Sequence, residues 1–251
     1  KAGEFLVTYR DPVMKLPRPS YDLWERKRGT STYTSAAVFG ALQAASELST
    51  LLGKEKQAKR FAKAAEEVQQ GILSHLWRKD VGMFCNTVNT ELGQPEYDAT
   101  IDISSVYGVF VFGILPPNEM RLLRAFEASV RRLSEGVSVG GIARFENDDY
   151  YRLPGSSTGN PWFLTTLWYA EYLIAVATTR EELSRARDIL TWTVRFALPS
   201  GVLSEQLDPS TGTQVCAVPL AWAHAAYVSA VVKYCERFES LGTLGKGKKR
   251  M

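Results

Sequence analysis

Two glutamates stand out among the residues that could do chemistry, because apolar side chains come just before each of them. Glu25 directly follows Leu23 and Trp24, and Glu205 comes two residues after Leu203. Burial beside a large aromatic side chain raises the pKa of a carboxyl group and keeps it protonated near neutral pH, as a general acid must be. Hydrolysis of a glycosidic bond needs a pair of carboxyl groups, one acid and one base or nucleophile. A single Glu before a helix is more often a charge that compensates the helix dipole, so the pair matters only if the fold brings both together.

The long connecting segments of the chain carry many acids, tryptophans and tyrosines. They cover residues 19–29, 80–100, 135–160 and 201–208, and the third contains Arg144. Aromatic rings can cover the apolar faces of pyranose rings, and carboxylates and an arginine can bond to sugar hydroxyls. The composition of these segments therefore predicts sugar binding.

Hydrophobic periodicity predicts about seven helices after an irregular, proline-containing segment at residues 1–30. The expected helices cover residues 31–52, 55–77, 101–115, 117–133, 160–177, 181–198 and 218–238. The first, third, fifth and seventh are largely apolar around their circumference, and the others are apolar on one side only. The helix at 31–52 has two apolar sides, which predicts that both are covered.

Alternation of this kind predicts a ring of inner helices wrapped by outer ones. Consecutive helices joined by short connections run antiparallel, so all inner helices point the same way. Every loop that enters an inner helix then lies on one rim, and this places Glu25 and Glu205 at the same end. The fold class expected is all-α, an α/α toroid. A helical solenoid is disfavoured because the sequence shows no repeating period.

Overall composition excludes several classes of function. The chain has 251 residues, 45% of them hydrophobic, and a net charge of +3, which is too mild for a nucleic-acid-binding face. The sequence contains no run of 18 apolar residues, so no membrane-spanning helix is expected. Three cysteines without CxxC spacing and two histidines predict no metal site and no cofactor. An odd number of cysteines and no visible signal peptide favour the cytoplasm.

Five strings in these segments resemble glycoside hydrolase family 15, the glucoamylase-like enzymes, in family order from about residue 7 to 234. They are Tyr-Asp-Leu-Trp-Glu at 21–25, Gly-Ile-Ala-Arg-Phe-Glu at 141–146, Gly-Asn-Pro-Trp-Phe-Leu at 159–164, Ser-Glu-Gln at 204–206 and Pro-Leu-Ala-Trp at 219–222. The resemblance implies an (α/α)6 barrel. It also implies an inverting, exo-acting hydrolase that releases β-glucose from the non-reducing end of an α-linked oligosaccharide or polysaccharide.

The resemblance also implies roles for individual residues. Glu25 would be the general acid and Glu205 the general base, with carboxyl groups about 6.5–9.5 Å apart as inversion requires. Arg144 would bond hydroxyls of the terminal glucose. The remaining residues expected to bind substrate are Asp22, Leu23 through its backbone carbonyl, Trp24, Trp162 and Trp222. For Trp162 and Trp222, core packing explains the sequence equally well.

Two departures from the family pattern affect these expectations. Arg26 stands where many fungal members have a second acid, so the linkage cleaved (α-1,4, α-1,6 or that of trehalose) stays open. The chain also supplies too few helices for six pairs, which predicts a toroid incomplete at its N-terminal side. Residues 1–240 would then be a portion of the catalytic domain that needs a preceding segment or a partner chain. Residues 241–251 would be a basic, disordered tail.

Two alternatives remain at this level. One is a glucan-binding or regulatory barrel without catalysis, which the fragment length favours and the presence of both Glu25 and Glu205 disfavours. The other is a different α/α toroid chemistry, such as a lyase or cyclase, which the lack of a metal cluster or a Tyr/His pair disfavours.

Overall fold

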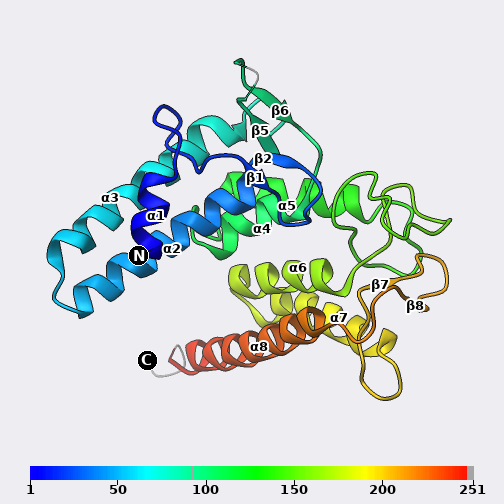
Figure 1. Ribbon diagram of the computed structural model, residues 1–251. Coiled ribbons are helices and arrows are strands. Elements are labelled where there is room, and N and C mark those ends of the chain that lie inside the picture. The colour runs from blue at the N-terminus through cyan, green and yellow to red at the C-terminus, as the bar shows by residue number, and fades with distance from the viewer. Residues whose placement is uncertain (92, 248–251) are drawn as a thin grey trace. The chain divides into compact units, whose positions relative to one another are not determined.

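The computed structural model describes residues 1–91 and 93–247, and most of the described chain is helical (Figure 1). The helices are α1 (Ala2–Thr8), α2 (Thr32–Leu51), α3 (Glu55–Gly71), the π-helical turn η1 (Ile72–Leu76), α4 (Ile103–Val111), α5 (Met120–Leu133), α6 (Phe163–Val176), α7 (Arg180–Phe196) and α8 (Ala221–Gly247). The chain forms two compact units, Lys1–Ala125 and Phe126–Met251, and each is described by itself. No helix within the described part of the chain is both long and apolar enough to cross a bilayer.

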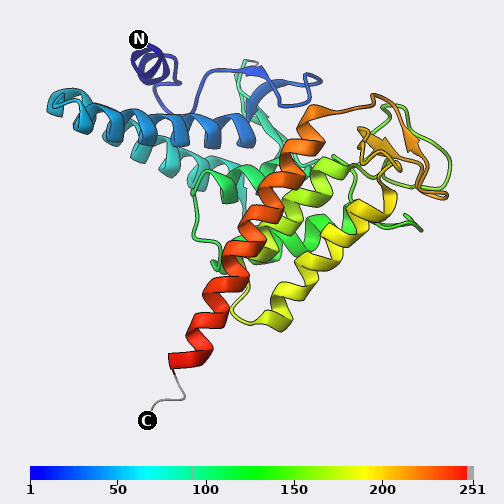
Figure 2. The ribbon, with the colours of Figure 1, turned by 90° about the horizontal axis from the view of Figure 1, so that it is seen from below.

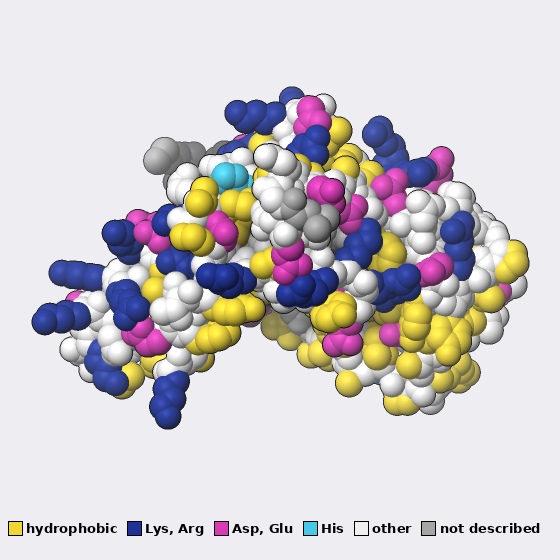
Figure 3. Space-filling view, turned by 45° about the horizontal axis from the view of Figure 1, so that its top comes forward, with side chains coloured by type: hydrophobic (Ala, Val, Ile, Leu, Met, Phe, Trp, Pro, Cys, Tyr) yellow, Lys and Arg dark blue, Asp and Glu magenta, His cyan; other side chains and the backbone are white. Residues whose placement is uncertain are grey.

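In the first unit, α2 packs against both α3 and α4. Ser31 caps α2, because its side chain accepts a hydrogen bond from the backbone N–H of Thr34 at 3.0 Å. Gly53 takes the left-handed conformation (φ 68°) that ends α2 and turns the chain into α3. One face of α3 is buried through Phe61 and Val68, and its lysines face solvent at the end of the α2–α3 pair (Figure 3). The one-sided helix predicted here is confirmed.

A small antiparallel sheet shapes the connecting segments of the first unit. Its strands are β1 (Ser20–Tyr21), β2 (Arg28–Ser31), β5 (Thr87–Asn89) and β6 (Glu96–Asp98), in the order β1-β2-β5-β6. The register pairs Ser20 with Gly29, so residues 22–27 form the tip of the β1–β2 hairpin. A second hairpin, β3 (Trp77–Arg78) with β4 (Met83–Phe84), follows η1.

In the second unit, α6 is buried on almost every side and packs against α7 and α8 (Figures 1 and 2). A capping box begins α7, since Thr179 accepts from the backbone of Glu182 and the Glu182 side chain accepts from the backbone of Thr179. The only other regular structure among the described residues of this unit, apart from the end of α5, is a hairpin of β7 (Gln206–Leu207) and β8 (Gln214–Val215). The residue before β7 is Glu205.

The seven predicted helices are confirmed, but several details were wrong. Residues 2–8 form α1, because the prolines that block helix formation begin only at Pro12. The α2 side that carries Leu48 and Leu51 is exposed, 57% and 83% respectively, so only one of its two apolar sides is covered. An apolar stripe indicates a surface that can be buried, but it does not specify what covers it.

The last helix also differs from expectation. Over residues 221–242 of α8, the buried side chains are those of Ala223, Ala226 and Ala230, while Val228 and Val232 are 60% and 51% exposed. The helix continues to Gly247, so residues 241–247 are helical and not a disordered tail. No proline interrupts this stretch, and single glycines cost a helix only about 1 kcal/mol each. Residues 248–251 of the predicted tail lie outside the described residues.

Candidate active site

The hairpin tip that carries Glu25 is shaped by the side chain of Asp22. The Oδ1 atom of Asp22 accepts hydrogen bonds from the backbone N–H groups of Arg26 at 2.8 Å and Lys27 at 3.3 Å. The Glu25 N–H donates to the Asp22 carbonyl at 3.1 Å, and Glu25 adopts a left-handed conformation with φ 57°. An aspartate that bonds to the backbone just after it stabilises a tight turn. Asp22, a predicted substrate ligand, is therefore buried within the loop as its internal brace.

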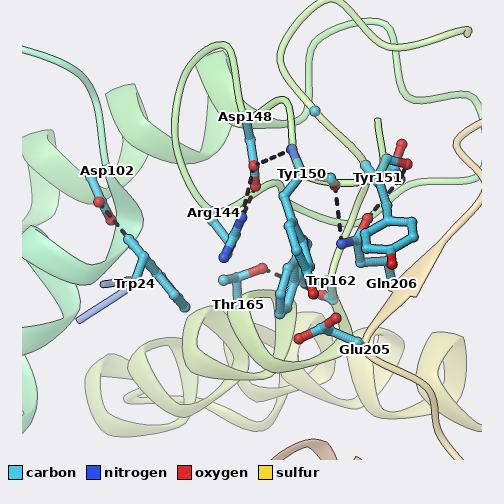
Figure 4. A network of polar contacts seen from close by, with 12 residues as sticks. Trp24, Asp102, Arg144, Asp148, Tyr150, Tyr151, Trp162, Thr165, Glu205 and Gln206 are labelled. Carbon is cyan, nitrogen blue, oxygen red and sulfur yellow. Dashed lines mark hydrogen bonds and ion pairs between the residues drawn. The ribbon is translucent and has the colours of Figure 1, made fainter. Parts of the chain in front are cut away.

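Trp24 anchors the same tip to a buried carboxyl group, that of Asp102 (Figure 4). Its indole Nε1–H donates to Oδ2 of Asp102 at 2.9 Å, and Oδ1 of Asp102 accepts from the backbone of Ser104 at 2.8 Å as the cap of α4. Burial raises the pKa of Asp102 to about 7, against the opposing effect of its hydrogen-bond donors. The loop of Glu25 and the start of α4 thus share one carboxyl group.

Burial of the two predicted catalytic carboxyl groups was overestimated from the sequence. Glu25 is exposed and Glu205 is only half-buried, whereas Asp102 is 3% exposed. Glu25 lies at the tip of the β1–β2 hairpin, where the apolar residues next to it in the sequence do not cover its carboxyl group. Leu23 and Trp24, beside it, are half-buried.

In the second unit, three connecting segments lie side by side at the start of α6. Isolated β-bridges join Ile142 to Trp162 and Trp162 to Gln206. Thr165 and Thr166 in the first turn of α6 fix the first segment, because Thr165 donates to the Ile142 carbonyl and Thr166 accepts from its N–H. The segments containing Arg144, Trp162 and Glu205 are therefore held together by backbone pairing.

Arg144 is buried on an aromatic surface and paired with a buried acid (Figure 4). Its Nε and Nη2 atoms donate to Oδ2 and Oδ1 of Asp148 at 2.7 and 2.8 Å. The guanidinium carbon lies 4.4 Å from the ring centroid of Trp162 and 5.0 Å from that of Tyr150. A bidentate, stacked arginine of this kind is held in one orientation.

Glu205 lies beside this group, and its segment is tied to the loop around Tyr150. The Nδ2 atom of Asn160 donates to Oε1 of Gln206 at 2.6 Å and to the Tyr151 carbonyl at 2.8 Å. Gln206 donates in turn to the Tyr150 carbonyl at 3.2 Å. Both amide side chains are fully buried, so they fix the path of the two loops.

Trp162 and Trp222, both predicted to wall a sugar pocket, occupy different surroundings. Trp162 is 3% exposed beneath Arg144 and Tyr150, which favours a supporting role over direct sugar contact. Trp222, in the first turn of α8, is 40% exposed and meets Trp168 edge-on at 5.7 Å. The N–H of Leu220 bonds to the Leu203 carbonyl at 2.9 Å, which brings the start of α8 to the segment of Glu205.

Several residues of this arrangement had no role assigned from the sequence. Asp148, four residues after Arg144, had a local signal, since oppositely charged side chains at this spacing often pair. Asp102 and Cys216 had no such local signal. The partner of Asp102, Trp24, is 78 residues away, and the partner of Cys216, Glu205, lies on the opposite side of a hairpin. Among the described residues, no three His, Cys, Asp or Glu side chains gather in a way that could hold a metal ion.

A cavity of about 470 Å³ in the first unit contains none of the predicted residues. This cavity is open to solvent and is lined by charged and polar side chains, among them Lys63, Glu66 and His75. Glu67, which also lines it, forms an ion pair with Arg10. We therefore take as the candidate site the segments that carry the predicted residues, and not this cavity.

The sequence resembles those of known glycosyl hydrolases. The model of the glycosyl hydrolases family 15 matches residues 14–196 and 183–232. The chain is 26% identical over 219 residues to an uncharacterised glycosyl hydrolase of Methanocaldococcus jannaschii, covering 84% of this chain and 33% of that protein. It is 25% identical over 229 residues to a trehalase of Mycolicibacterium smegmatis, covering 90% and 32%.

The fold has counterparts among solved structures. A bacterial glucoamylase complexed with acarbose superposes with a TM-score of 0.74 at 20% identity, covering 94% of this chain and 39% of that one. This likeness confirms the all-α class and the α/α toroid fold. The chain spans about a third of the length of the first two relatives. The family model nevertheless covers most of the chain, so the resemblance predicted from its motifs is confirmed: this chain belongs to family 15 of the glycosyl hydrolases.

Proposed function

We propose that the chain carries the acid–base pair of an inverting, exo-acting glycoside hydrolase that releases β-glucose from the non-reducing end of α-glucosides. Glu25 protonates the glycosidic oxygen as general acid. Glu205 removes a proton from the attacking water as general base. The bond between the anomeric carbon and the glycosidic oxygen breaks while a bond to the water oxygen forms on the opposite face of the ring.

The observation that carries the proposal is the group around Glu205 in the second unit. A half-buried carboxyl group lies on one of three segments joined by backbone bridges, and the other two carry a guanidinium fixed against the rings of Tyr150 and Trp162. Tyr150 is 38% exposed and so offers an aromatic surface to a sugar ring. A carboxylate for water, an arginine for hydroxyls and an aromatic face for the ring are the elements that a glucose-binding site requires.

The other predicted residues have proposed roles that are described within each unit. Arg144 binds hydroxyls of the terminal glucose, in an orientation set by Asp148. On the first unit, the Asp22–Trp24 segment presents the acid and the Leu23 carbonyl. Trp222, exposed at the start of α8, supplies a further aromatic surface.

Backbone strain supports the same assignment. Glu25, Tyr151 and Cys216 all have positive φ angles, 57°, 51° and 66°. Non-glycine residues pay about 1–3 kcal/mol for such conformations and keep them mainly where function requires it. Three of the strained residues in the described chain therefore lie in or beside the two segments assigned to catalysis.

The substrate class is an α-linked glucose oligosaccharide or the disaccharide trehalose. The relatives include a trehalase, and the bacterial glucoamylase was solved with acarbose. These names describe those proteins, each much longer than this chain, and they define the substrates worth testing here.

The test is a proton NMR time course of the chain with maltotriose, isomaltose and trehalose in turn, beside Glu205→Gln. Glu181→Gln is the matched control, because Glu181 is an exposed glutamate in the same unit. The appearance of glucose reports which linkage is cleaved, and the anomeric signals report the configuration of the glucose released. We expect β-glucose first from maltotriose, and equal amounts of α- and β-glucose from trehalose, because the leaving glucose keeps its α configuration. Cleavage should be lost in Glu205→Gln and kept in Glu181→Gln.

Other outcomes would replace the proposal. Early α-glucose from maltotriose, or α-glucose alone from trehalose, would show retention and exclude a water activated by Glu205 as the direct nucleophile. No turnover of any substrate, with an oligosaccharide still bound, would favour the glucan-binding alternative.

A further inference from the structure

The hairpin of β7 and β8 places an unassigned cysteine directly opposite the proposed general base. The register pairs Gln206 with Val215 and Leu207 with Gln214, and the regular ladder ends there. The N–H of Glu205 donates to the carbonyl of Ala217 at 2.9 Å, one residue beyond the position that the register predicts, so Cys216 is an extra residue opposite Glu205, as in a β-bulge. A bulge re-aims the side chain of the extra residue.

The side chains of this cross-strand pair are in contact. The Sγ atom of Cys216 lies 2.7 Å from Oε2 of Glu205, with the thiol as donor. It also lies 3.7 Å from the phenol oxygen of Tyr150. The thiol thus lies between the carboxylate and the exposed aromatic ring of the same group.

The thiol carries its proton at neutral pH. Burial and the hydrogen bond to Glu205 both raise the pKa of Cys216 above its usual value. The pKa of Tyr150 is raised to about 12, chiefly through its contact with Cys216 and then through burial and the Glu205 charge. Both groups therefore stay neutral, and neither adds a negative charge beside the carboxylate.

The backbone of Cys216 is held in a conformation that costs energy. Its φ of 66° lies in the left-handed region, where a non-glycine residue is uncommon. Glycine adopts this backbone conformation without the steric cost that a cysteine has. The backbone conformation therefore does not by itself favour a cysteine at this position, whereas the contact of its side chain with Glu205 does.

We propose that Cys216 is a positioning residue for Glu205: its S–H holds one carboxylate oxygen in place, so that the other can accept the proton of the attacking water. The inference rests on the proposed role of Glu205. The other titratable side chains of the cluster are Tyr150, Tyr151 and Arg144, which is paired with its own aspartate.

The first test measures the contact itself and needs no catalytic activity. The chain and Glu205→Gln are treated with iodoacetamide over a range of pH, and alkylation of each cysteine is followed by mass spectrometry of peptides. Removing the carboxylate charge lowers the pH at which the thiolate forms, so Cys216 should react several-fold faster at pH 7 in Glu205→Gln. Cys235, which is exposed on α8, is the internal reference and should not change.

Equal rates at Cys216 in the chain, in Glu205→Gln and in the control Glu181→Gln would overturn the proposal. A rate that rises equally at Cys235 would show general loosening of the fold, and this would also count against it.

The second test compares kcat and KM for maltotriose in Cys216→Ala and Cys216→Ser. Loss of the donor should lower kcat in Cys216→Ala and leave KM near its wild-type value, because the substrate still binds but the carboxylate is no longer held. The serine hydroxyl should restore kcat. A loss of kcat that Cys216→Ser does not restore, or a change confined to KM, would overturn the proposal. If the unmodified chain turns over no substrate, the proposed function fails, while the alkylation rates still decide whether the contact exists.

Discussion

The two hairpins that carry Glu25 and Glu205 hold their carboxyl groups by different means. At the β1–β2 tip, the loop is fixed and the Glu25 side chain is left exposed: Asp22 braces the backbone, and the indole of the neighbouring tryptophan is bonded to a buried acid. At the β7–β8 hairpin, the Glu205 carboxyl group itself is held, by the thiol of Cys216. A general acid needs to reach a leaving group and change protonation, whereas a general base must orient one water molecule, and the two arrangements suit these tasks.

The two buried acids, Asp102 in the first unit and Asp148 in the second, differ in what compensates their burial. Within the described residues, the hydrogen bonds to Asp102 come from neutral groups, the indole N–H of Trp24 and backbone and side-chain groups of Ser104, and burial raises its pKa to about 7. Asp148 has a bidentate guanidinium partner in Arg144. Two carboxyl groups that are nearly inaccessible to solvent thus depend on different compensation for the loss of water, which stability measurements can separate.

The largest effect is expected where a buried cation loses its paired carboxylate. Asp148→Ala should destabilise the second unit by about 3–5 kcal/mol, because it removes both hydrogen bonds from the buried Arg144 guanidinium to that carboxylate and the negative charge that faces it. Urea unfolding followed by circular dichroism measures the loss. Asp188→Ala is the control, since it removes an acid from the exposed Arg187 pair and should cost at most about 1 kcal/mol. Similar losses in the two variants would show that the buried pair is not special.

Asp102 should give the first unit a stability that falls as pH rises. Its pKa is near 3.8 when unfolded and about 7 when folded, so between these values the folded chain binds a proton that the unfolded chain does not. The contribution is favourable below pH 4 and is lost progressively up to about pH 7. One pKa unit corresponds to about 1.4 kcal/mol, so the full loss amounts to a few kcal/mol.

Asp102→Asn tests this directly. Asparagine cannot ionise, but its single acceptor oxygen can replace only one of the two carboxylate oxygens, so either the cap of α4 or the bond from Trp24 is lost. The variant should be less stable than the chain near pH 4, and this difference should shrink or reverse between pH 4 and pH 8. Thermal unfolding at several pH values gives the comparison. A difference in stability that does not change with pH would show that Asp102 does not take up a proton on folding.

Trp24→Phe should have a smaller effect. It removes the indole donor to Asp102 and keeps the aromatic ring, at a cost of about 1–2 kcal/mol. The matched control is Trp77→Phe, because Trp77 packs against Phe84 through its ring. Equal changes in unfolding free energy for the two variants would argue that the hydrogen bond does not hold the hairpin tip.

The helices could be predicted because their signal is local. The cap at Ser31 and the apolar circumference of α6 specify element type without reference to the rest of the chain. The exposed side of α2 could not be predicted, since apolar periodicity does not identify the covering surface. The helical residues 2–8 were missed because a later proline was taken to exclude helix throughout the segment.

The sequence predicts which loops carry the candidate site residues, but it does not predict which side chains those residues contact. Motif resemblance identified Glu25, Arg144 and Glu205, and backbone bridges join the segments of the last two. The partners that hold them depend on tertiary placement: Asp102 is 78 residues from Trp24, and Cys216 faces Glu205 only because a hairpin forms. The burial predicted for Glu25 was wrong because it also depends on tertiary placement. At the hairpin tip, the apolar residues next to Glu25 in the sequence do not cover its carboxyl group.

The central claim is that the two glutamates play different roles, and one kinetic comparison tests it most directly. Glu25→Gln and Glu205→Gln are assayed with maltose and with α-glucosyl fluoride, beside the exposed control Glu47→Gln. Fluoride leaves without protonation, so Glu25→Gln should lose about 10²–10⁴-fold in kcat on maltose and far less on the fluoride. Glu205→Gln should lose activity on both, because each reaction still needs an activated water. Equal losses of the two variants on both substrates, or full activity in either, would contradict the assignment of acid and base.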